Sequence, residues 1–261
     1  MIVILGYDSS SVANLGLTQV GDYLRQPGAL LWLDATAPTE PDLIQLRQLF
    51  QFQRQHLDAC RGEIKPPLAA TPRYLFAPMT AANGQPWFVF LGKSYLVTIH
   101  AEPLEAVAAQ YGRYAQEVNL WSHGVDQLFL SLTETSVYPF AERLAGLKAD
   151  GRSLFERQEA LLHLERQVVG QTAVLQQISR LQQEYLDANI AHYIGQAGQW
   201  LQGVSEEAGF HGRLLAQQIE AQRHELLSRK LAATQQLAWI VAFLFALILI
   251  MTIAFIAQLF L

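Results

Sequence analysis

The chain has 261 residues, a formal net charge of −5 and a single cysteine, Cys60. The negative charge argues against nucleic acid as a partner, and one cysteine excludes an intrachain disulfide and a cysteine-based metal cluster. About 236 residues precede a long apolar C-terminal segment, which is enough for one large domain or a domain with a helical extension.

Residues 1–122 carry the signals of a mixed α/β domain. The apolar runs at 1–7 and 29–35 are short and bounded by polar residues or glycine, which predicts two strands. The stretch 74–100 is expected to contain three more strands. Turn signals separate these three strands, at Asn83-Gly84 and Gly92-Lys93.

Helices are predicted on either side of these three strands. Thr39 is a candidate N-cap and a proline follows it closely, so a helix is expected to start there. Its apolar residues recur on one face, at Leu43, Leu46 and Phe50. A second helix is expected from about residue 102. Helices and strands in this order favour an α/β layered domain.

Residues 123–204 change to helical periodicity. An apolar stripe begins at Val125, reaches Leu147 and is broken at Asp150-Gly151. After the break, apolar residues recur every seven positions, which indicates coiled-coil-like packing against a neighbouring helix. These positions are Leu154, Leu161, Val168 and Leu175, with Leu164, Ile178 and Tyr185 on the same seam. A further short helix is expected over 190–201.

The last helix is expected to begin near Ser205, where Glu206 and Glu207 favour a helix N-terminus. No proline follows, so we expect one helix of up to about 55 residues, with a cytoplasmic stalk over 205–236 and a membrane helix over 237–261. The stalk has a loose apolar stripe and many glutamines. Self-association around an axis is the favoured interpretation, and packing only against the chain's own helical hairpin is the alternative.

The membrane helix is predicted from an apolar segment of 25 residues at 237–261. At about 1.5 Å per residue such a helix reaches roughly 37 Å, and a bilayer core is about 30 Å thick. Thr252 and Gln258 are its only strongly polar side chains. A buried core helix is the alternative, but such a helix rarely lacks a polar face over this length.

The flanking charges predict the orientation of the span. Arg223, Arg229 and Lys230 lie just before it, and basic residues remain on the cytoplasmic side of a membrane. The first ten residues lack the basic region of a signal peptide. We therefore expect a single-pass protein of the cell (inner) membrane, with the N-terminal domain in the cytoplasm and the C-terminus at the far side.

Three stretches, in this order along the chain, resemble the CorA family of divalent-cation transporters. LLWLDATAPTEPDLIQLRQLF (30–50) is similar to the family's tryptophan-aspartate strand followed by a PTEEEL helix start. GKSYLVTIHAEPLEAV (92–107) is similar to NFLVTVHREPLPAL, and GVDQLFLSLTETSVYPFAERL (124–144) to PDYLLYALLDALVDRYFPVLERL. The resemblance covers most of the chain. It implies a cytoplasmic α/β domain with helical hairpins, a homopentamer and transport of magnesium or cobalt.

The end of the sequence departs from the family pattern. In the family, the first span leads into a glycine-methionine-asparagine (GMN) loop, usually preceded by tyrosine, and a second span follows. Phe255-Ile256-Ala257 match the family, but Gln258 stands where the family has glycine and Phe260 where it has tyrosine. Because the sequence ends at Leu261, we expect a divergent single-span member that lacks the GMN motif and the second transmembrane helix.

The family's pore positions can be carried over to the span. They are Leu237, Ile240, Leu244, Leu247, Met251, Ala254 and Gln258. All but the last are apolar, whereas a selective filter needs oxygen ligands and a narrow apolar tube excludes ions. We therefore expect a homo-oligomeric scaffold or regulator that does not conduct, or a channel subunit that needs a second membrane protein. The alternative is a magnesium or cobalt transporter whose first transmembrane helix lines the pore.

Candidate metal ligands are sparse, and no cofactor is predicted from the residues themselves. The resemblance implies Mg²⁺ or another divalent cation. Glu220 and His224 lie four residues apart and are a candidate ligand pair, although a solvated i,i+4 interaction is favoured. Other carboxylates match no fixed motif: Asp126, Glu134, Glu206 and Glu207. No nucleophile–base pair has a recognisable context, so an enzyme is not expected.

Overall fold

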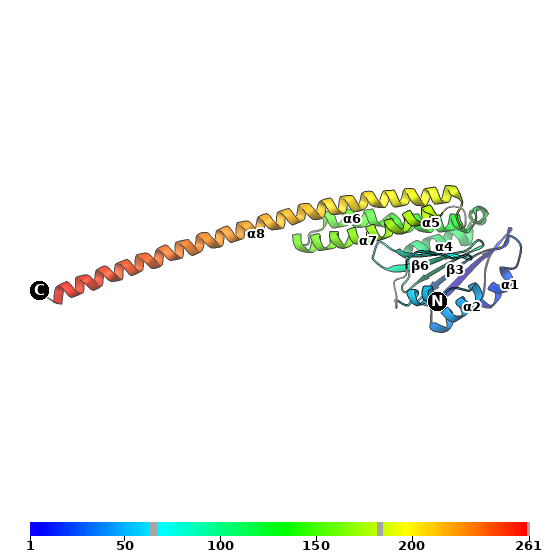
Figure 1. Ribbon diagram of the computed structural model, residues 1–261, viewed down its shortest axis with the longest axis horizontal. Coiled ribbons are helices and arrows are strands. Elements are labelled where there is room, and N and C mark those ends of the chain that lie inside the picture. Colours follow the sequence, from blue (N-terminus) through cyan, green and yellow to red (C-terminus); the bar gives the residue numbers. More distant parts are fainter. Residues whose placement is uncertain (63–66, 182–184, 260–261) are drawn as a thin grey trace.

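The computed structural model describes residues 1–62, 67–181 and 185–259, with side chains up to Thr252 at the C-terminal end. A globular α/β part lies at one end of the molecule, and a single long helix leaves it toward the C-terminus (Figure 1). The expected α+β/α architecture, an α/β layered domain with helical hairpins and a long C-terminal helix, is confirmed.

One mixed sheet forms the centre of the globular part. Its strands are β1 (Ile2–Tyr7), β2 (Val12–Asn14), β3 (Leu30–Thr36), β4 (Ala69–Ala70), β5 (Leu75–Thr80), β6 (Pro86–Leu91) and β7 (Tyr95–His100). Their order is β2-β1-β3-β7-β6-β5-β4. The central pair β3–β7 is parallel, and the other pairs are antiparallel.

The predicted strands and turns are confirmed, and the two strands at the sheet edges were not predicted. β2 and β4 have only 3 and 2 residues, which is too short to show an alternating pattern. The predicted β5–β6 turn contains Gly84 at φ +90°, a left-handed conformation that glycine adopts without steric cost.

Eight α-helices and two 3-10 turns complete the described residues. They are η1 (Leu17–Gln19), α1 (Val20–Tyr23), α2 (Glu40–Phe50), α3 (Arg54–Cys60), α4 (Glu105–Gln116), η2 (Val118–His123), α5 (Val125–Val137), α6 (Pro139–Ala149), α7 (Leu154–Arg180) and α8 (Ala188–Leu259). The predicted N-cap of α2 is confirmed: Thr39 and Asp42 form a reciprocal capping box.

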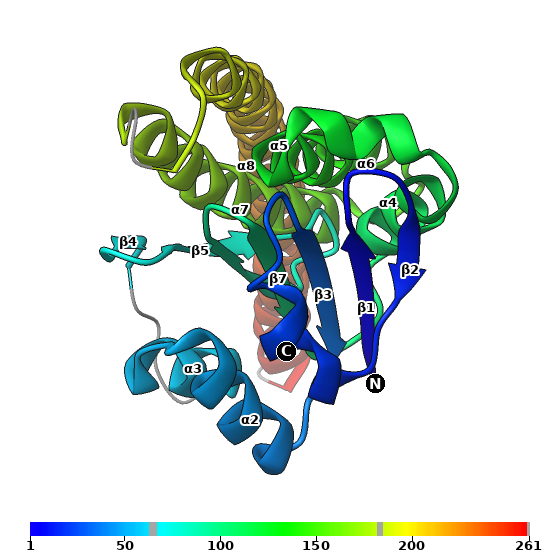
Figure 2. The ribbon, with the colours of Figure 1, turned by 90° about the vertical axis from the view of Figure 1, so that its right-hand side faces the viewer.

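Helices cover both faces of the sheet (Figure 2). Successive strand residues point to opposite faces. Leu31 and Leu33 therefore pack in the core beside α2 and α3, whereas Trp32 packs in the core beside α4 and α5. α7 lies over β5 on the same face as α5.

α7 and the first part of α8 pack against each other as an antiparallel hairpin. The predicted seam of α7 is buried, since Leu161, Leu164, Val168, Leu175 and Ile178 are each at most 1% exposed. Glycines in α8 allow the two helices to approach closely. A Cβ atom at Gly198 would lie 3.4 Å from the Leu175 Cβ atom, and one at Gly209 would lie 2.6 Å from the Glu165 Oε1 atom.

Two helix boundaries differ from the expectation. α8 has 72 residues and begins at Ala188, so the expected start near Ser205 and the separate short helix over 190–201 are wrong. Ser205 is buried in the hairpin, and packing against α7 keeps the helix continuous there. The stripe from Val125 to Leu147 is divided between α5 and α6 at Pro139, which has no N–H to donate within a helix.

Candidate functional site

The outer part of α8 is the most unusual surface of the molecule. Every residue from Glu220 to Thr252 is exposed, and this part of the helix projects away from the globular part (Figure 1). Among the described residues, α8 is the one helix that is long and apolar enough to cross a membrane, and none of its apolar stretch is buried. A contiguous apolar surface of this size requires cover from lipid or from another chain.

The predicted pore positions lie on this outer part. Leu237, Ile240, Leu244, Leu247 and Met251 follow one face of α8, and between 44% and 66% of each is exposed. Ala254 and Gln258 belong to α8, but their side chains lie outside the described residues. The assignment of this face to a pore stays a prediction, as does the absence of a GMN loop and a second span.

Polar groups are scarce on the apolar part of α8. The Thr252 hydroxyl donates a hydrogen bond of 2.7 Å to the Ile248 carbonyl oxygen of its own helix. The hydroxyl proton of Thr252 is therefore already used in a hydrogen bond within the helix, as is usual for threonine in a helix within an apolar environment.

Glu220 and His224 lie on one face of α8, as their spacing predicts. The His224 Nε2 atom is 3.9 Å from the Glu220 Oε2 atom, and both side chains are exposed. No group of three or more potential metal ligands occurs among the described residues. In a single chain this pair is therefore a solvent-exposed i,i+4 contact.

The other candidate carboxylates do not come together. Asp126 accepts a hydrogen bond from the Asp187 backbone N–H, just before α8. Glu207 pairs with Lys148, which lowers the pKa of the glutamate below its usual value. Glu206 accepts a hydrogen bond from Gln202, and Glu134 lines a surface pocket between α5 and α8. Each carboxylate therefore has a separate local environment.

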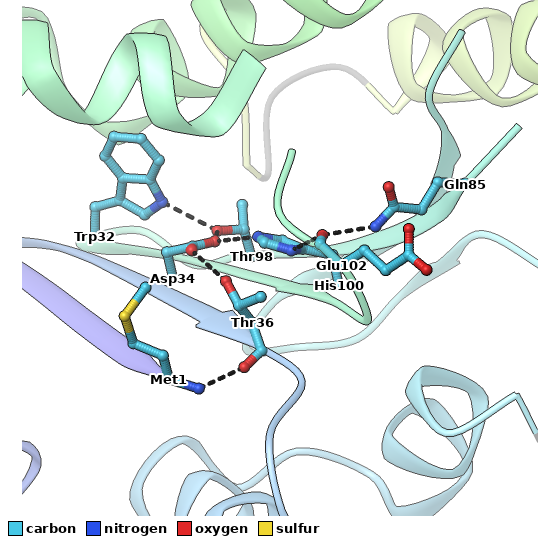
Figure 3. A network of polar contacts seen from close by, with 8 residues as sticks. All are labelled: Met1, Trp32, Asp34, Thr36, Gln85, Thr98, His100 and Glu102. Atoms are coloured by element: carbon cyan, nitrogen blue, oxygen red, sulfur yellow. Dashed lines mark hydrogen bonds and ion pairs between the residues drawn. The ribbon is translucent and has the colours of Figure 1, made fainter. Parts of the chain in front are cut away.

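A buried polar network crosses the two central strands, at the residues that carry the CorA resemblance (Figure 3). β3 and β7 pair in parallel with Asp34 beside Thr98. The Trp32 Nε1–H group donates to the Thr98 hydroxyl at 3.2 Å, and that hydroxyl donates to Asp34 Oδ1 at 2.5 Å. The His100 Nε2 atom lies 2.9 Å from the same carboxylate oxygen.

The hydrogen-bond geometry determines how many protons the pair of Asp34 and His100 holds. The His100 Nδ1 atom is 2.6 Å from the Glu102 carbonyl oxygen, which can only accept, so Nδ1 carries a proton. A second proton must lie between Nε2 and the Asp34 carboxylate, because two lone pairs would otherwise face each other. The buried pair is thus neutral overall, which is the condition for burying such groups.

This network joins several segments of the globular part. The Met1 amino group donates to the Thr36 carbonyl oxygen at the end of β3. The Gln85 amide donates to the Glu102 carbonyl oxygen, which ties the β5–β6 turn to the loop before α4. The network therefore positions α4 against the sheet.

The network is not arranged for catalysis. Asp34 is 4% exposed, Thr98 0% and His100 2%, so a substrate cannot reach them. We assign these residues a structural role. Sequence reasoning missed them, although an aspartate and a histidine within apolar strands were a visible signal.

No protein-family model and no curated protein matches the sequence. Solved structures do match. The chain is similar to the full-length CmaX protein, with a TM-score of 0.72 and 16% identity over 91% of this chain and 80% of that chain. It is also similar to the soluble domain of CorA from Methanocaldococcus jannaschii, with a TM-score of 0.66 and 13% identity over 84% of this chain and 95% of that chain.

A third structure agrees with these two. The ZntB cytoplasmic domain from Vibrio parahaemolyticus RIMD 2210633 matches with a TM-score of 0.65 and 14% identity, over 86% of this chain and 99% of that chain. Identities this low establish the fold alone. The chain therefore has the fold of the CorA, CmaX and ZntB structures, with α8 continuing from it as a long, apolar and uncovered helix.

Proposed function

We propose that the chain is a homo-oligomeric membrane subunit that takes part in divalent-cation transport through its CorA-like fold. The uncovered outer part of α8, attached to that fold, is the observation that carries this proposal. One similar structure, from M. jannaschii, is described as the CorA magnesium transporter; it matches with a TM-score of 0.65 and 14% identity. The role is non-enzymatic, and the cargo is a divalent cation such as Mg²⁺.

The apolar part of α8 crosses the cell (inner) membrane. Basic residues just before it, Arg223, Arg229 and Lys230, keep the globular part in the cytoplasm and send the C-terminal end of the helix to the far side. Arg229 pairs with Glu225 at 2.6 Å. Arg223 and Lys230 have no carboxylate partner within the described part of the chain and face the acidic membrane surface.

Self-association covers the stalk between the globular part and the membrane. Leu226, Leu227 and Leu231 are 60%, 51% and 63% exposed in the single chain, and a second helix would bury them. The number of subunits in the proposal, five, comes from the resemblance to the CorA family.

The chain alone does not conduct cations in this proposal. A divalent cation must exchange its water shell for fixed oxygen atoms in a selective pore. The described part of the span offers only the Thr252 hydroxyl, which is bound to its own helix. In this proposal a second membrane protein supplies the coordinating oxygens, and without it the oligomer is a non-conducting scaffold.

Flux measurements on the purified full chain in liposomes test this function. We expect no Mg²⁺, Co²⁺ or Zn²⁺ entry above empty liposomes, and we expect entry when a membrane protein that copurifies with the chain is incorporated. Entry through the chain alone would contradict the need for a partner. In that case Met251→Trp, on the predicted pore face, should block it, and Ile250→Trp, one residue away, is the matched control.

A further inference from the structure

A small pocket lies where α5 meets α8, on the globular part of the molecule. Glu134 and Tyr138 come from α5 and the residue after it, and Tyr193 and Trp200 come from α8. The pocket has a volume of about 170 Å³, which corresponds to roughly five or six water molecules. Neither the membrane segment nor the polar network contributes to it.

Helical spacing brings these side chains together. Glu134 and Tyr138 lie four residues apart and share a face, and Tyr193 and Trp200 lie two turns apart on α8. Ala197 stands between the last two and also lines the pocket, so its small side chain leaves the hollow open. The rings of Tyr138 and Trp200 meet at 78° with their centroids 5.5 Å apart, which is an edge-to-face contact.

The carboxylate in the pocket has no partner within the described part of the chain. Neither a hydrogen bond nor an ion pair engages the Glu134 side chain, and no lysine or arginine lines the pocket. Partial burial raises the pKa of Glu134 above its usual value, as expected for a carboxylate that lacks a counter-charge. An external cation would supply that charge.

We propose that this pocket binds the alkylated ammonium head of a small organic cation. Tyrosine and tryptophan rings attract such a head through their π faces, and Glu134 neutralises its charge. A bare metal ion fits poorly, because Mg²⁺ and Ca²⁺ require several oxygen ligands and only one carboxylate is present. The chemistry of the pocket does not depend on whether α8 crosses a membrane, whereas the exclusion of lipid as the source of the cation rests on the proposed function.

The position of the pocket limits the sources of the cation. Trp200 and Leu237 are 37 residues apart on one helix, which is roughly 55 Å at 1.5 Å per residue. A lipid headgroup at the membrane therefore cannot reach the pocket. The ammonium group therefore belongs to a dissolved molecule.

Calorimetric titration of the full chain, in nanodiscs made without choline lipids, tests the proposal. Choline is the probe, and its uncharged isostere 3,3-dimethyl-1-butanol is the matched ligand control. We expect choline to bind and the isostere to bind at least about tenfold more weakly. The isostere has no positive charge, so it loses the attraction to the aromatic rings and to Glu134.

Two variants locate the binding, and one variant serves as control. Glu134→Gln keeps the shape of the side chain and should weaken choline binding about tenfold, and Trp200→Leu should weaken it at least about fivefold. Phe210→Leu removes another exposed aromatic residue of α8 and should leave affinity unchanged. Thermal melting of each variant checks that the fold is retained.

The results of the titration either support binding of a dissolved cation or overturn the proposal. Saturable binding at any subunit concentration supports a dissolved ligand. Choline binding that weakens as the chain self-associates, together with weaker self-association in Glu134→Gln, would overturn the proposal, because a group of a second copy would then occupy the pocket. Equal binding of choline and its isostere, or no choline binding to the folded chain, would overturn the proposal.

Discussion

The two parts of α8 have the same helical backbone and opposite surroundings. The inner part, from Ala188 to Ile219, buries a stripe of small and apolar side chains against α7, including Ala191, Ile194, Leu201 and Ala208. The outer part, from Glu220 to Thr252, buries no described residue. Because helices in proteins are stabilised mainly by packing, the inner part is stable within one chain, and the outer part needs lipid or another chain.

The largest effect on stability is expected in the globular part, because contacts within a single chain stabilise it. Asp34→Ala would leave His100 without its carboxylate partner, and removing one member of a buried pair costs about 3–5 kcal/mol. Denaturant unfolding, followed by fluorescence, measures this change. Asp22→Ala, which removes an exposed pair with Arg25, is the control and should change stability by at most about 1 kcal/mol. Equal effects of the two variants would disprove the structural role of the network.

A matched pair of leucines compares the two parts of α8 directly. Leu201→Ala, at a residue that is 0% exposed, should lower the free energy of unfolding of the globular part by about 2–5 kcal/mol. Leu231→Ala, at a residue that is 63% exposed, should change it by less than about 0.5 kcal/mol. The free energy of unfolding is measured on detergent-solubilised protein with a single spectroscopic probe in the globular part. A large effect of Leu231→Ala would mean that the outer part packs on its own chain.

A charge within the apolar part of α8 tests the membrane assignment. Leu247→Lys should disfavour insertion by about 2.5–3.5 kcal/mol at the centre of a span, which is read as a lower fraction of protein in carbonate-washed membranes. Gln236→Lys, just before the apolar segment, is the control and should leave insertion unchanged. Full membrane retention of Leu247→Lys would count against a span at this depth.

The smallest effect is expected at a helix cap on the surface. Thr39→Ala removes the side chain that caps α2 and should cost about 1 kcal/mol of stability, measured as a lower thermal midpoint. Thr39→Ser retains the hydroxyl and should behave like the unchanged protein. Because this cap lies far from α8, neither variant should alter membrane insertion.

Much of the fold could be predicted from the sequence because local patterns determine it. The strands around Trp32 and Val97, the cap at Thr39 and the turn at Gly84 follow from apolar runs and turn residues that act within a few positions. The helix start expected near Ser205 was wrong, because the acidic residues after Ser205 suggested a helix N-terminus and packing against α7 overrode this local signal.

The sites were harder to predict because they depend on contacts between distant residues. Asp34 and His100 meet only when β3 and β7 pair in parallel. The aromatic pocket requires α5 and α8 to pack, and its residues come from positions about 60 apart along the chain. The apolar span, in contrast, was visible in the sequence because its pattern is continuous.

Cysteine accessibility in membranes tests the central claim most directly. The natural thiol, Cys60, donates a hydrogen bond to the His56 carbonyl oxygen, and burial raises its pKa, so Cys60→Ala gives a background without thiols. Gln222→Cys, at an exposed stalk position outside the leucine stripe, and Leu247→Cys in that background are then treated with a membrane-impermeant maleimide in opened membrane vesicles. We predict that the cysteine at 222 is labelled and the one at 247 is shielded until detergent is added. Equal labelling of both before detergent would contradict a membrane-spanning α8.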